Sequence, residues 1–254
     1  MRILLLLSTV VLLFLPARTG SGQAPPLRVF CSNAIRVAME QLLPNAERAI
    51  GRRIDVRYSS STALRQSIDK GEPFDLAILT PNLIDELVKT GRVRNGTRTD
   101  IASVDLAVGI RAGAPKADVG TPDAMKRRLL AARSLTWTEG GASSEPVAAM
   151  LRALGIEEQV RSRIVLQHVP GTAAETVARG ENELVFAPRS EIQTVAGVEV
   201  LGLFPKEFQR PIVMTAGIAA SARDANAAEA LIRFLMSPGA APALQATGMK
   251  PATR

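Results

Sequence analysis

The 254-residue sequence predicts an α/β protein of two lobes, each a mostly parallel sheet flanked by helices. Strand-like and helix-like hydrophobic periods alternate through most of the chain, which is typical of parallel sheets covered by helices on both faces. The alternation lapses into polar residues over 91–99, and a second set of alternating units begins after an apolar run at 104–110. About 230 residues follow the N-terminal segment described below, a length that suits two small lobes.

The N-terminus has the pattern of a secretory signal peptide. Met1 and Arg2 precede an apolar run over 3–15, and small and polar residues follow over 16–22. The run is too short to span a bilayer, which takes about 20 apolar residues. We therefore predict that residues 1–24 are a signal peptide, that the mature chain is exported to the periplasm, and that it has no stable membrane insertion.

Composition excludes several classes of partner. The formal net charge is +7, but the basic residues are scattered and aromatic residues make up only 4%, so the chain lacks the basic stripe with interleaved aromatics of a nucleic-acid binder. The single cysteine, Cys31, lies inside a predicted strand, too far from the apolar run for lipid attachment, and should be a small buried residue. His168 is the only histidine, which excludes a His-rich metal site. We predict no cofactor, no metal and no nucleic-acid partner.

The first lobe begins with three strands, predicted over 27–31, 54–58 and 76–79. The helix after the first strand carries Ile35, Met39 and Leu42 on one face, and Pro44 should end or kink it. A later helix starts at Thr80, followed by proline at the first helical position. Such βαβαβα units place ligands in the crevice beyond the carboxyl ends of the strands.

The run 104–110 is predicted as one long strand that leaves the first lobe. The segments after it are predicted as helices over 121–132, 147–154 and 172–179 and as strands over 134–138, 164–169, 184–187, 198–201 and 212–219. The last strand leads back to the first lobe, where 228–235 forms an amphipathic helix. We therefore assign 25–110 and 207–254 to lobe 1 and 111–206 to lobe 2.

Four loops between a strand and a helix carry small or hydroxyl residues. A first helical turn has free backbone N–H groups and partial positive charge, so it attracts anions. Each loop alone is more often a helix cap, and Ser61, Ser144 and Thr172 would be good N-caps, the last with Glu175 as a capping box. Four such loops facing one crevice, however, indicate an anion site. The predicted ligand contacts are Ser32, Asn33, Ser60, Ser61, Ser143, Ser144, Gly171 and Thr172.

The loops carry almost no charged side chains at the expected contact points, apart from Arg36 and Glu145 just beyond them. A fully ionised tetrahedral dianion needs donors only, and neutral dipoles supply these without the desolvation cost of an ion pair. A protonated phosphate would also require an acceptor carboxylate. The pattern therefore favours a sulfate-like or molybdate-like oxyanion over phosphate.

Two stretches carry a family resemblance. The turn 58–61 (Tyr-Ser-Ser-Ser) and the later segment 71–76 (Gly-Glu-Pro-Phe-Asp-Leu) follow the first strand in an order similar to that of the periplasmic molybdate-binding proteins of ABC importers, within the type II solute-binding class. Weaker similarity covers nearly the whole mature chain. The resemblance implies a monomer whose two lobes close on an oxyanion and which then docks on a membrane permease. It also implies a ligand contact by Ser61 and a donating backbone amide at Ser143.

The sequence departs from the family at three positions. Ala34 stands where a contact serine is expected, Pro188 where a tyrosine often lies, and Pro170 where a backbone N–H should donate, although Gly171 could replace it. These departures leave two other functions open. One is a binding protein for another small anion, such as an organic acid held by Asn33 and an arginine such as Arg36. The other is a secreted hydrolase that uses His168, although we predict that the chain is not an enzyme.

Overall fold

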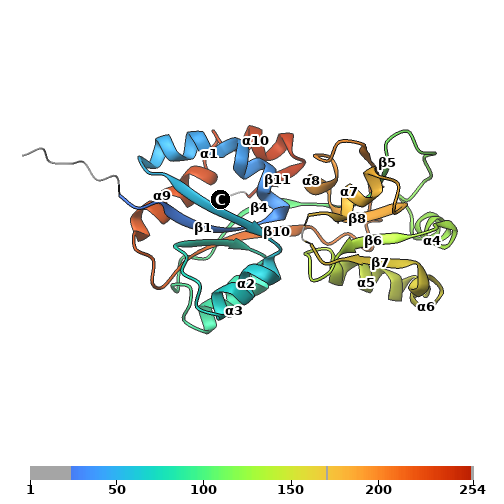
Figure 1. Cartoon of the computed structure of the whole chain (residues 1–254), viewed down its shortest axis with the longest axis horizontal. Helices are drawn as coiled ribbons and strands as arrows, with labels where there is room; N and C mark the ends of the chain where they lie inside the picture. Colours follow the sequence, from blue (N-terminus) through green and yellow to red (C-terminus); the bar gives the residue numbers. More distant parts are fainter. Residues whose placement is uncertain (1–23, 170, 253–254) are drawn as a thin grey trace, which may run out of the picture.

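The computed structural model describes residues 24–169 and 171–252, which form two lobes lying side by side along the long axis (Figure 1). The predicted signal peptide lies almost wholly outside the described residues. The strands are β1 (Leu27–Ser32), β2 (Ile54–Ser59), β3 (Leu76–Leu79), β4 (Thr99–Val104), β5 (Leu106–Arg111), β6 (Leu135–Thr138), β7 (Ile164–Gln167), β8 (Leu184–Pro188), β9 (Val198–Leu203), β10 (Ile212–Ile218) and β11 (Met249–Pro251).

Helices flank both sheets. They are α1 (Arg36–Ile50), α2 (Ser61–Asp69), α3 (Pro81–Lys89), α4 (Pro122–Ala131), α5 (Ser144–Ala153), α6 (Glu157–Val160), α7 (Ala173–Ala178), α8 (Arg189–Ile192), α9 (Ala225–Leu235) and α10 (Ala241–Ala246), with short 3-10 helices η1 (Asn33–Ile35) and η2 (Arg161–Arg163). In the described part of the chain, the first lobe has a six-stranded sheet in the order β11-β4-β10-β3-β1-β2, and the second has a five-stranded sheet in the order β7-β6-β8-β5-β9. The predicted two-lobed α/β class is confirmed.

Each sheet combines parallel and antiparallel pairs. β1 is parallel to both β2 and β3, and β6 is parallel to both β7 and β8, as the alternation of strands and helices predicts. β10 runs antiparallel between β3 and β4, and β5 runs antiparallel between β8 and β9. β5 follows the first crossing of the chain from one lobe to the other, and β10 follows the second crossing.

The single strand predicted over 104–110 is two strands, because the chain changes sheets at Asp105. Gln209 lies in the segment that returns to the first lobe, and its side chain binds both backbone groups of Leu106, in the segment that leaves that lobe. The Gln209 Oε1 accepts from the Leu106 N–H at 2.9 Å, and the Gln209 Nε2 donates to the Leu106 carbonyl at 3.0 Å. By sheet membership 106–110 belongs to the second lobe rather than the first. The rest of the predicted division into lobes is not decided by the sheets and stays a prediction.

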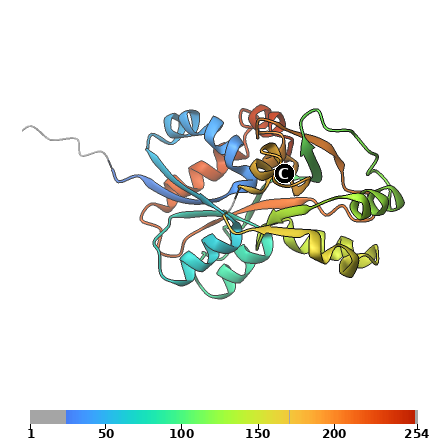
Figure 2. The same cartoon turned by 45° about the vertical axis from the view of Figure 1, so that its right-hand side comes forward.

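Alternate residues of the first strand face two different layers. Val29 and Cys31 are fully buried against α1 and α9, whereas Phe30 faces the opposite side with Leu64 of α2. In Figures 1 and 2 the blue helix α1 accordingly lies on one side of the sheet, and the cyan and teal helices α2 and α3 lie on the other. Burial on both faces explains the continuous apolar strands. It also confirms Cys31 as a buried small residue.

Helix α1 does not end at Pro44, which was one of the two outcomes predicted for this proline. It continues to Ile50 and ends where Gly51 adopts a left-handed φ of 65°. Pro44 lies on the exposed face, so the carbonyl that its missing N–H leaves free is on the side facing water. Ala46 is fully buried beyond it, and this packing holds the second half of the helix against the core.

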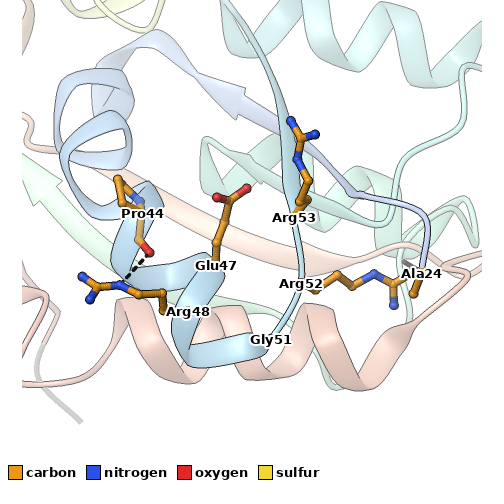
Figure 3. Close-up of a pocket in the computed structure, with 7 residues that line it drawn as sticks. All are labelled: Ala24, Pro44, Glu47, Arg48, Gly51, Arg52 and Arg53. Atoms are coloured by element: carbon orange, nitrogen blue, oxygen red, sulfur yellow. Dashed lines mark hydrogen bonds between the residues drawn. The ribbon is translucent and has the colours of Figure 1, made fainter. Parts of the chain in front are cut away.

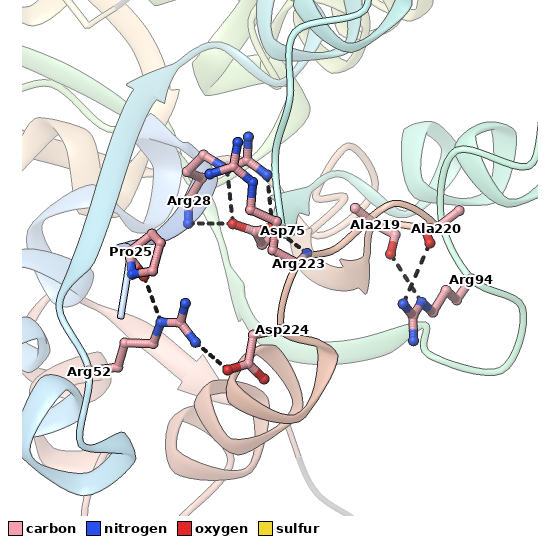
Figure 4. Close-up of polar contacts among 9 residues, drawn as sticks. All are labelled: Pro25, Arg28, Arg52, Asp75, Arg94, Ala219, Ala220, Arg223 and Asp224. Atoms are coloured by element: carbon pink, nitrogen blue, oxygen red, sulfur yellow. Dashed lines mark hydrogen bonds and ion pairs between the residues drawn. The ribbon is translucent and has the colours of Figure 1, made fainter. Parts of the chain in front are cut away.

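A buried carboxylate ties three separate segments of the first lobe together (Figure 4). Asp75, 1% exposed, accepts hydrogen bonds from the Arg28 backbone at 2.9 Å, from the Arg28 side chain at 2.9 and 3.0 Å, and from the Arg223 backbone at 3.0 Å. Burial opposes ionisation of Asp75, but the hydrogen bonds from Arg28 and Arg223 outweigh it and lower the pKa to about 2. The same figure shows Arg52, in the turn before β2, pairing with Asp224, which caps α9.

Replacing Arg28 by methionine should lower the free energy of unfolding by about 3 kcal/mol, because it leaves a buried carboxylate without its partner. Arg233→Met is the matched control. It removes an exposed i,i+4 pair with Glu229 and should change stability by less than about 0.5 kcal/mol. Chemical denaturation at pH 7 measures both. Equal losses in the two variants would contradict a special role for the buried pair.

Asp75 should also make the protein sensitive to acid. Its folded-state pKa of about 2 lies below the unfolded value of about 3.9, so its stabilisation is fully present above pH 4 and is lost as the pH falls toward 2. The loss over this interval amounts to roughly 2 kcal/mol. Asp75→Asn should be less stable at pH 7 and should show a shallower fall between pH 4 and pH 2 in denaturant titrations. An unchanged slope would show that Asp75 is not the group responsible.

Candidate functional site

Most of the predicted contact residues surround one small enclosed cavity between the lobes. The cavity has a volume of about 20 Å³, which is roughly the space that one or a few water molecules occupy. The walls come from the carboxyl ends of strands and the starts of helices in both lobes. The lining residues are Ser32, Asn33, Ser60, Ser61, Thr138, Gly141, Ala142, Ser143, Gly171, Phe186, Ala187, Pro188 and Glu191.

The serine pair at the start of α2 divides two tasks. Ser60, not Ser61, is the N-cap, and its side chain accepts from the Ala63 N–H at 3.2 Å. Ser61 is thereby left free: it is 3% exposed, and its hydroxyl oxygen has no hydrogen-bond partner among the described residues. Buried polar groups without a partner are rare and costly, so this hydroxyl is placed for a bound solute rather than for the fold.

Asn33 and Gly171 meet across the cavity. The Asn33 Oδ1 is also buried without a partner in the described chain. Gly171 has a φ of +87°, and a Cβ added there would lie 3.4 Å from the Asn33 Nδ2. Only glycine combines this backbone conformation with such a close approach. Pro170 lies outside the described residues, so donation by Gly171 in its place stays a prediction.

Three serine and threonine hydroxyls of the second lobe hold the loops together. Ser143 donates to the Phe186 carbonyl at 3.2 Å, which leaves its backbone amide as its contribution to the cavity, in line with the resemblance. Ser144 donates to the Thr138 carbonyl at 2.9 Å, and Thr172 donates to the Val169 carbonyl at 2.8 Å. Neither Ser144 nor Thr172 lines the cavity, and Thr172 makes no side-chain cap on α7. The structure therefore gives no support to these two predicted contacts.

Two hydrogen bonds join the lobes beside the cavity. The Thr62 hydroxyl, next to Ser61, donates to the Gly140 carbonyl at 2.8 Å. The buried Ser190 hydroxyl donates to the Ala34 carbonyl at 2.7 Å. Ala34, which stands where the family has a contact serine, thus takes part through its backbone. The lobes are closed on each other in this structure.

A wider groove lies next to the cavity. It offers about 290 Å³ and shares Asn33, Gly171 and Glu191 with the inner cavity. Arg36 lines it, with its guanidinium 5.2 Å from the centre of the Tyr58 ring and its Nε 2.7 Å from Glu40. The ion pair with Glu40 is about half exposed and therefore weak, so Arg36 is able to exchange Glu40 for an anionic ligand.

Glu191 is the residue that the sequence prediction missed. It lies on α8, directly after β8, where it lines both the inner cavity and the groove. Its carboxyl group makes no hydrogen bond or ion pair with the described residues, and burial raises its pKa to about 7. Its position in the chain could have indicated it, because the β8–α8 connection is a fifth strand-to-helix loop at the same crevice. The sequence did not reveal this loop, because α8 is too short to show a helical period.

Other candidates lie elsewhere. A hollow of about 520 Å³ beside the end of α1 is lined by Glu47, Arg48, Arg52 and Arg53 (Figure 3). It belongs to one lobe, and its groups serve the fold: Arg48 bonds the Pro44 carbonyl, and Glu47 accepts from the Ile54 N–H. We therefore do not assign a ligand to it.

His168 is an exposed residue, with Nδ1 2.7 Å from the Glu139 carboxylate, and it does not line the cavity. Trp137 packs edge-on against Phe186 and is 7% exposed, so it belongs to the core. The described residues contain no group of three or more His, Cys, Asp and Glu that could hold a metal ion. Within the same ranges, no helix is long and apolar enough to cross a membrane.

Comparison with known families agrees with this geometry. The family model of the bacterial extracellular solute-binding proteins matches residues 27–250. The chain belongs to this family. This solute-binding protein is 28% identical over 255 residues to a protein named aconitate isomerase from Pseudomonas sp, an alignment that covers 98% of this chain and 94% of the relative. It is 22% identical over 232 residues to the molybdate-binding protein ModA of Azotobacter vinelandii, covering 90% and 91%.

Solved structures share the fold of this solute-binding protein. The periplasmic molybdate-binding protein of Azotobacter vinelandii superimposes with a TM-score of 0.74 at 22% identity, covering 89% of this chain and all of that one. The sulfate-binding protein SubI from Mycobacterium tuberculosis H37Rv gives a TM-score of 0.73 at 16% identity, covering 90% and 88%. These findings confirm the resemblance predicted from 58–61 and 71–76 and the two-lobed type II fold.

Removing the unpaired hydroxyl should not destabilise the ligand-free protein. Ser61→Ala should leave the free energy of unfolding unchanged or raise it by up to about 1 kcal/mol, since a buried group without a partner is lost. Ser143→Ala is the matched comparison, because it removes a hydroxyl that donates to the Phe186 carbonyl and should cost about 1 kcal/mol. Chemical denaturation of both variants checks this. A loss at Ser61 as large as that at Ser143 would mean that the Ser61 hydroxyl has a structural partner.

Proposed function

We propose that this protein is the extracytoplasmic binding component of an ABC importer and that its cleft captures a small organic acid. One carboxylate of the ligand occupies the inner cavity, and its remaining atoms extend into the groove. The observation that carries the proposal is the unpaired Glu191 carboxyl at the junction of the two spaces. A carboxyl there repels a fully ionised tetrahedral dianion, whereas an organic acid presents its charge at the donors and its carbon chain at Glu191.

The inner cavity supplies the donors that a carboxylate needs. The Ser61 hydroxyl has no partner among the described residues, and the Ser61 and Thr62 amides at the start of α2 have no intrahelical partner. Ser143 lines the same cavity from the other lobe with its backbone amide. A carboxylate has two oxygens to satisfy, and donors from both lobes would close the cleft on it. Binding energy would then favour the closed state joined by the Thr62 and Ser190 hydrogen bonds.

The groove suits the rest of a polycarboxylic acid. Its volume of about 290 Å³ exceeds what an inorganic tetrahedral oxyanion requires, and Arg36 offers a guanidinium for a second carboxylate. The relative named aconitate isomerase supports this ligand class, because aconitic acid is a small unsaturated tricarboxylic acid. Delivery to a permease, a periplasmic location and a monomeric state are parts of the same proposal and rest on membership of the family.

A molybdate-like or tungstate-like oxyanion, the ligand expected from the sequence, is the second candidate. The small inner cavity with its serine hydroxyls favours it, as does the similarity to molybdate-binding proteins. The hydrolase alternative has no comparable support, because His168 lies outside the cavity.

Calorimetric titration of the protein, refolded to remove bound solutes, distinguishes these ligands. We expect heat at micromolar concentrations from di- and tricarboxylates such as cis-aconitate, trans-aconitate and citrate, and none from molybdate, tungstate, sulfate or phosphate. Ser61→Ala should weaken carboxylate binding about tenfold, corresponding to one lost hydrogen bond to a charged group. Ser144→Ala is the control, because Ser144 does not line the cavity and its hydroxyl donates to the Thr138 carbonyl, and it should bind like wild type.

Two outcomes would overturn the organic-acid proposal. Micromolar binding of molybdate without binding of carboxylates would establish the second candidate. Silence from every anion would exclude both ligand classes for this cleft.

A further inference from the structure

We propose that Glu191 is a catalytic acid–base residue, and that the cleft isomerises a bound unsaturated polycarboxylate by moving a proton between two of its carbon atoms. This inference rests on the proposed function, since it requires the organic acid to occupy the inner cavity and the groove together. Both proposals involve the Glu191 carboxyl: the proposed function uses its charge, and this inference uses its ability to carry a proton.

Glu191 has no structural task that explains it. The residue is half-buried and lines both the cavity and the groove, and no described residue pairs with its carboxyl group. The other charged residues lining the groove are occupied elsewhere: Arg36 pairs with Glu40, and Glu175 lies 3.8 Å from Arg179. A site built only to bind fully ionised anions gains nothing from an acidic group at this junction.

Position makes Glu191 the available proton carrier. Among the described residues lining the inner cavity it is the only one with a carboxyl, imidazole, amine or thiol group. Burial raises its pKa to about 7, so both its charged and neutral forms are accessible near neutral pH. His168, the only histidine of the sequence, is exposed and lies outside the cavity.

The chemistry is a balanced 1,3-proton shift. The Glu191 carboxylate removes a proton from the saturated carbon next to the double bond, and the C–H electron pair forms a new double bond while the old one moves toward the conjugated carboxyl group. The resulting negative charge rests on that carboxyl group. The protonated Glu191 then returns the proton to the far carbon of the three-carbon unit, which restores both the carboxylate and the double bond in its new position.

The inner cavity is suited to the charge that develops in this step. The conjugated carboxyl group becomes more negative when the proton leaves, and it faces the Ser61 hydroxyl and the first-turn amides of α2. Fixed donors in a closed, small cavity stabilise developing negative charge more than they stabilise the starting acid. No oxidant, reductant or metal is needed.

The test follows cis- and trans-aconitate by proton NMR in D₂O with the full-length mature protein. The expected results are interconversion of the two isomers and incorporation of deuterium at carbon, with a rate that rises with pH through a midpoint near 7. Glu191→Gln should slow both at least 100-fold, because it removes the base. Its affinity by calorimetry should be retained or improved, since the amide keeps the shape and loses the repulsion.

Glu145→Gln serves as the matched control. Glu145 is an exposed residue outside the cavity, paired with Arg152, and its variant should keep the wild-type rate. Melting curves of both variants check that they are folded.

The outcomes separate the two proposals. Binding of aconitate by wild type without isomerisation or deuterium exchange would overturn the catalytic inference and leave the binding function standing. Turnover by Glu191→Gln at the wild-type rate would overturn the assignment of this residue. Failure of wild type to bind any carboxylate would overturn the proposed function, and the inference with it.

Discussion

The arrangement of the molecule depends on how the chain passes twice between its two sheets. Gln209 binds the two passages to each other through both backbone groups of Leu106, and Lys250 pairs with the neighbouring Asp105 at 2.8 Å. Because these contacts fix the passages side by side, the carboxyl ends of parallel strands from both lobes open onto one crevice. The helix N-termini at that crevice are therefore brought together by topology, and the anion-binding character of the cleft follows from it.

The sequence predicted the parts of the fold that depend on local period and punctuation. Strand and helix alternation gave the two-lobed α/β class, and the serine-rich turn before Leu64 marked the start of α2 correctly to within one residue. It failed where tertiary packing decides. Pro44 is tolerated within α1 because Ala46 is buried beyond it, and 104–110 breaks at Asp105 because the next strand pairs in another sheet.

The candidate site, like the fold, was predicted where local sequence patterns decide and missed where tertiary structure decides. The composition of the strand-to-helix loops predicted Ser61, Asn33 and Gly171, which line the cavity, because a helix start has a recognisable composition; that they contact a ligand stays a prediction. Which hydroxyl is free could not be predicted, since Ser60 and Ser61 are both good caps and only the helix register assigns the cap to Ser60. Glu191 could not be predicted either, because its four-residue helix has no period and its importance arises from two spaces that meet only in the folded molecule.

Ser61 and Asn33 line the inner cavity with buried polar atoms that have no partner among the described residues, which works against stability. The Glu191 carboxyl lines the same cavity and pairs with no described residue either. The first lobe shows the contrasting case, where the buried Asp75 carboxylate accepts four hydrogen bonds from two segments. The fold therefore supplies enough hydrogen-bond donors for the Asp75 carboxylate, although it supplies none from the described residues to the Glu191 carboxyl group. The difference lies in what each group faces: Asp75 faces its own backbone, whereas Glu191 faces a space. A bound solute that brings its own polar groups is the simplest physical reason for leaving that space unfilled.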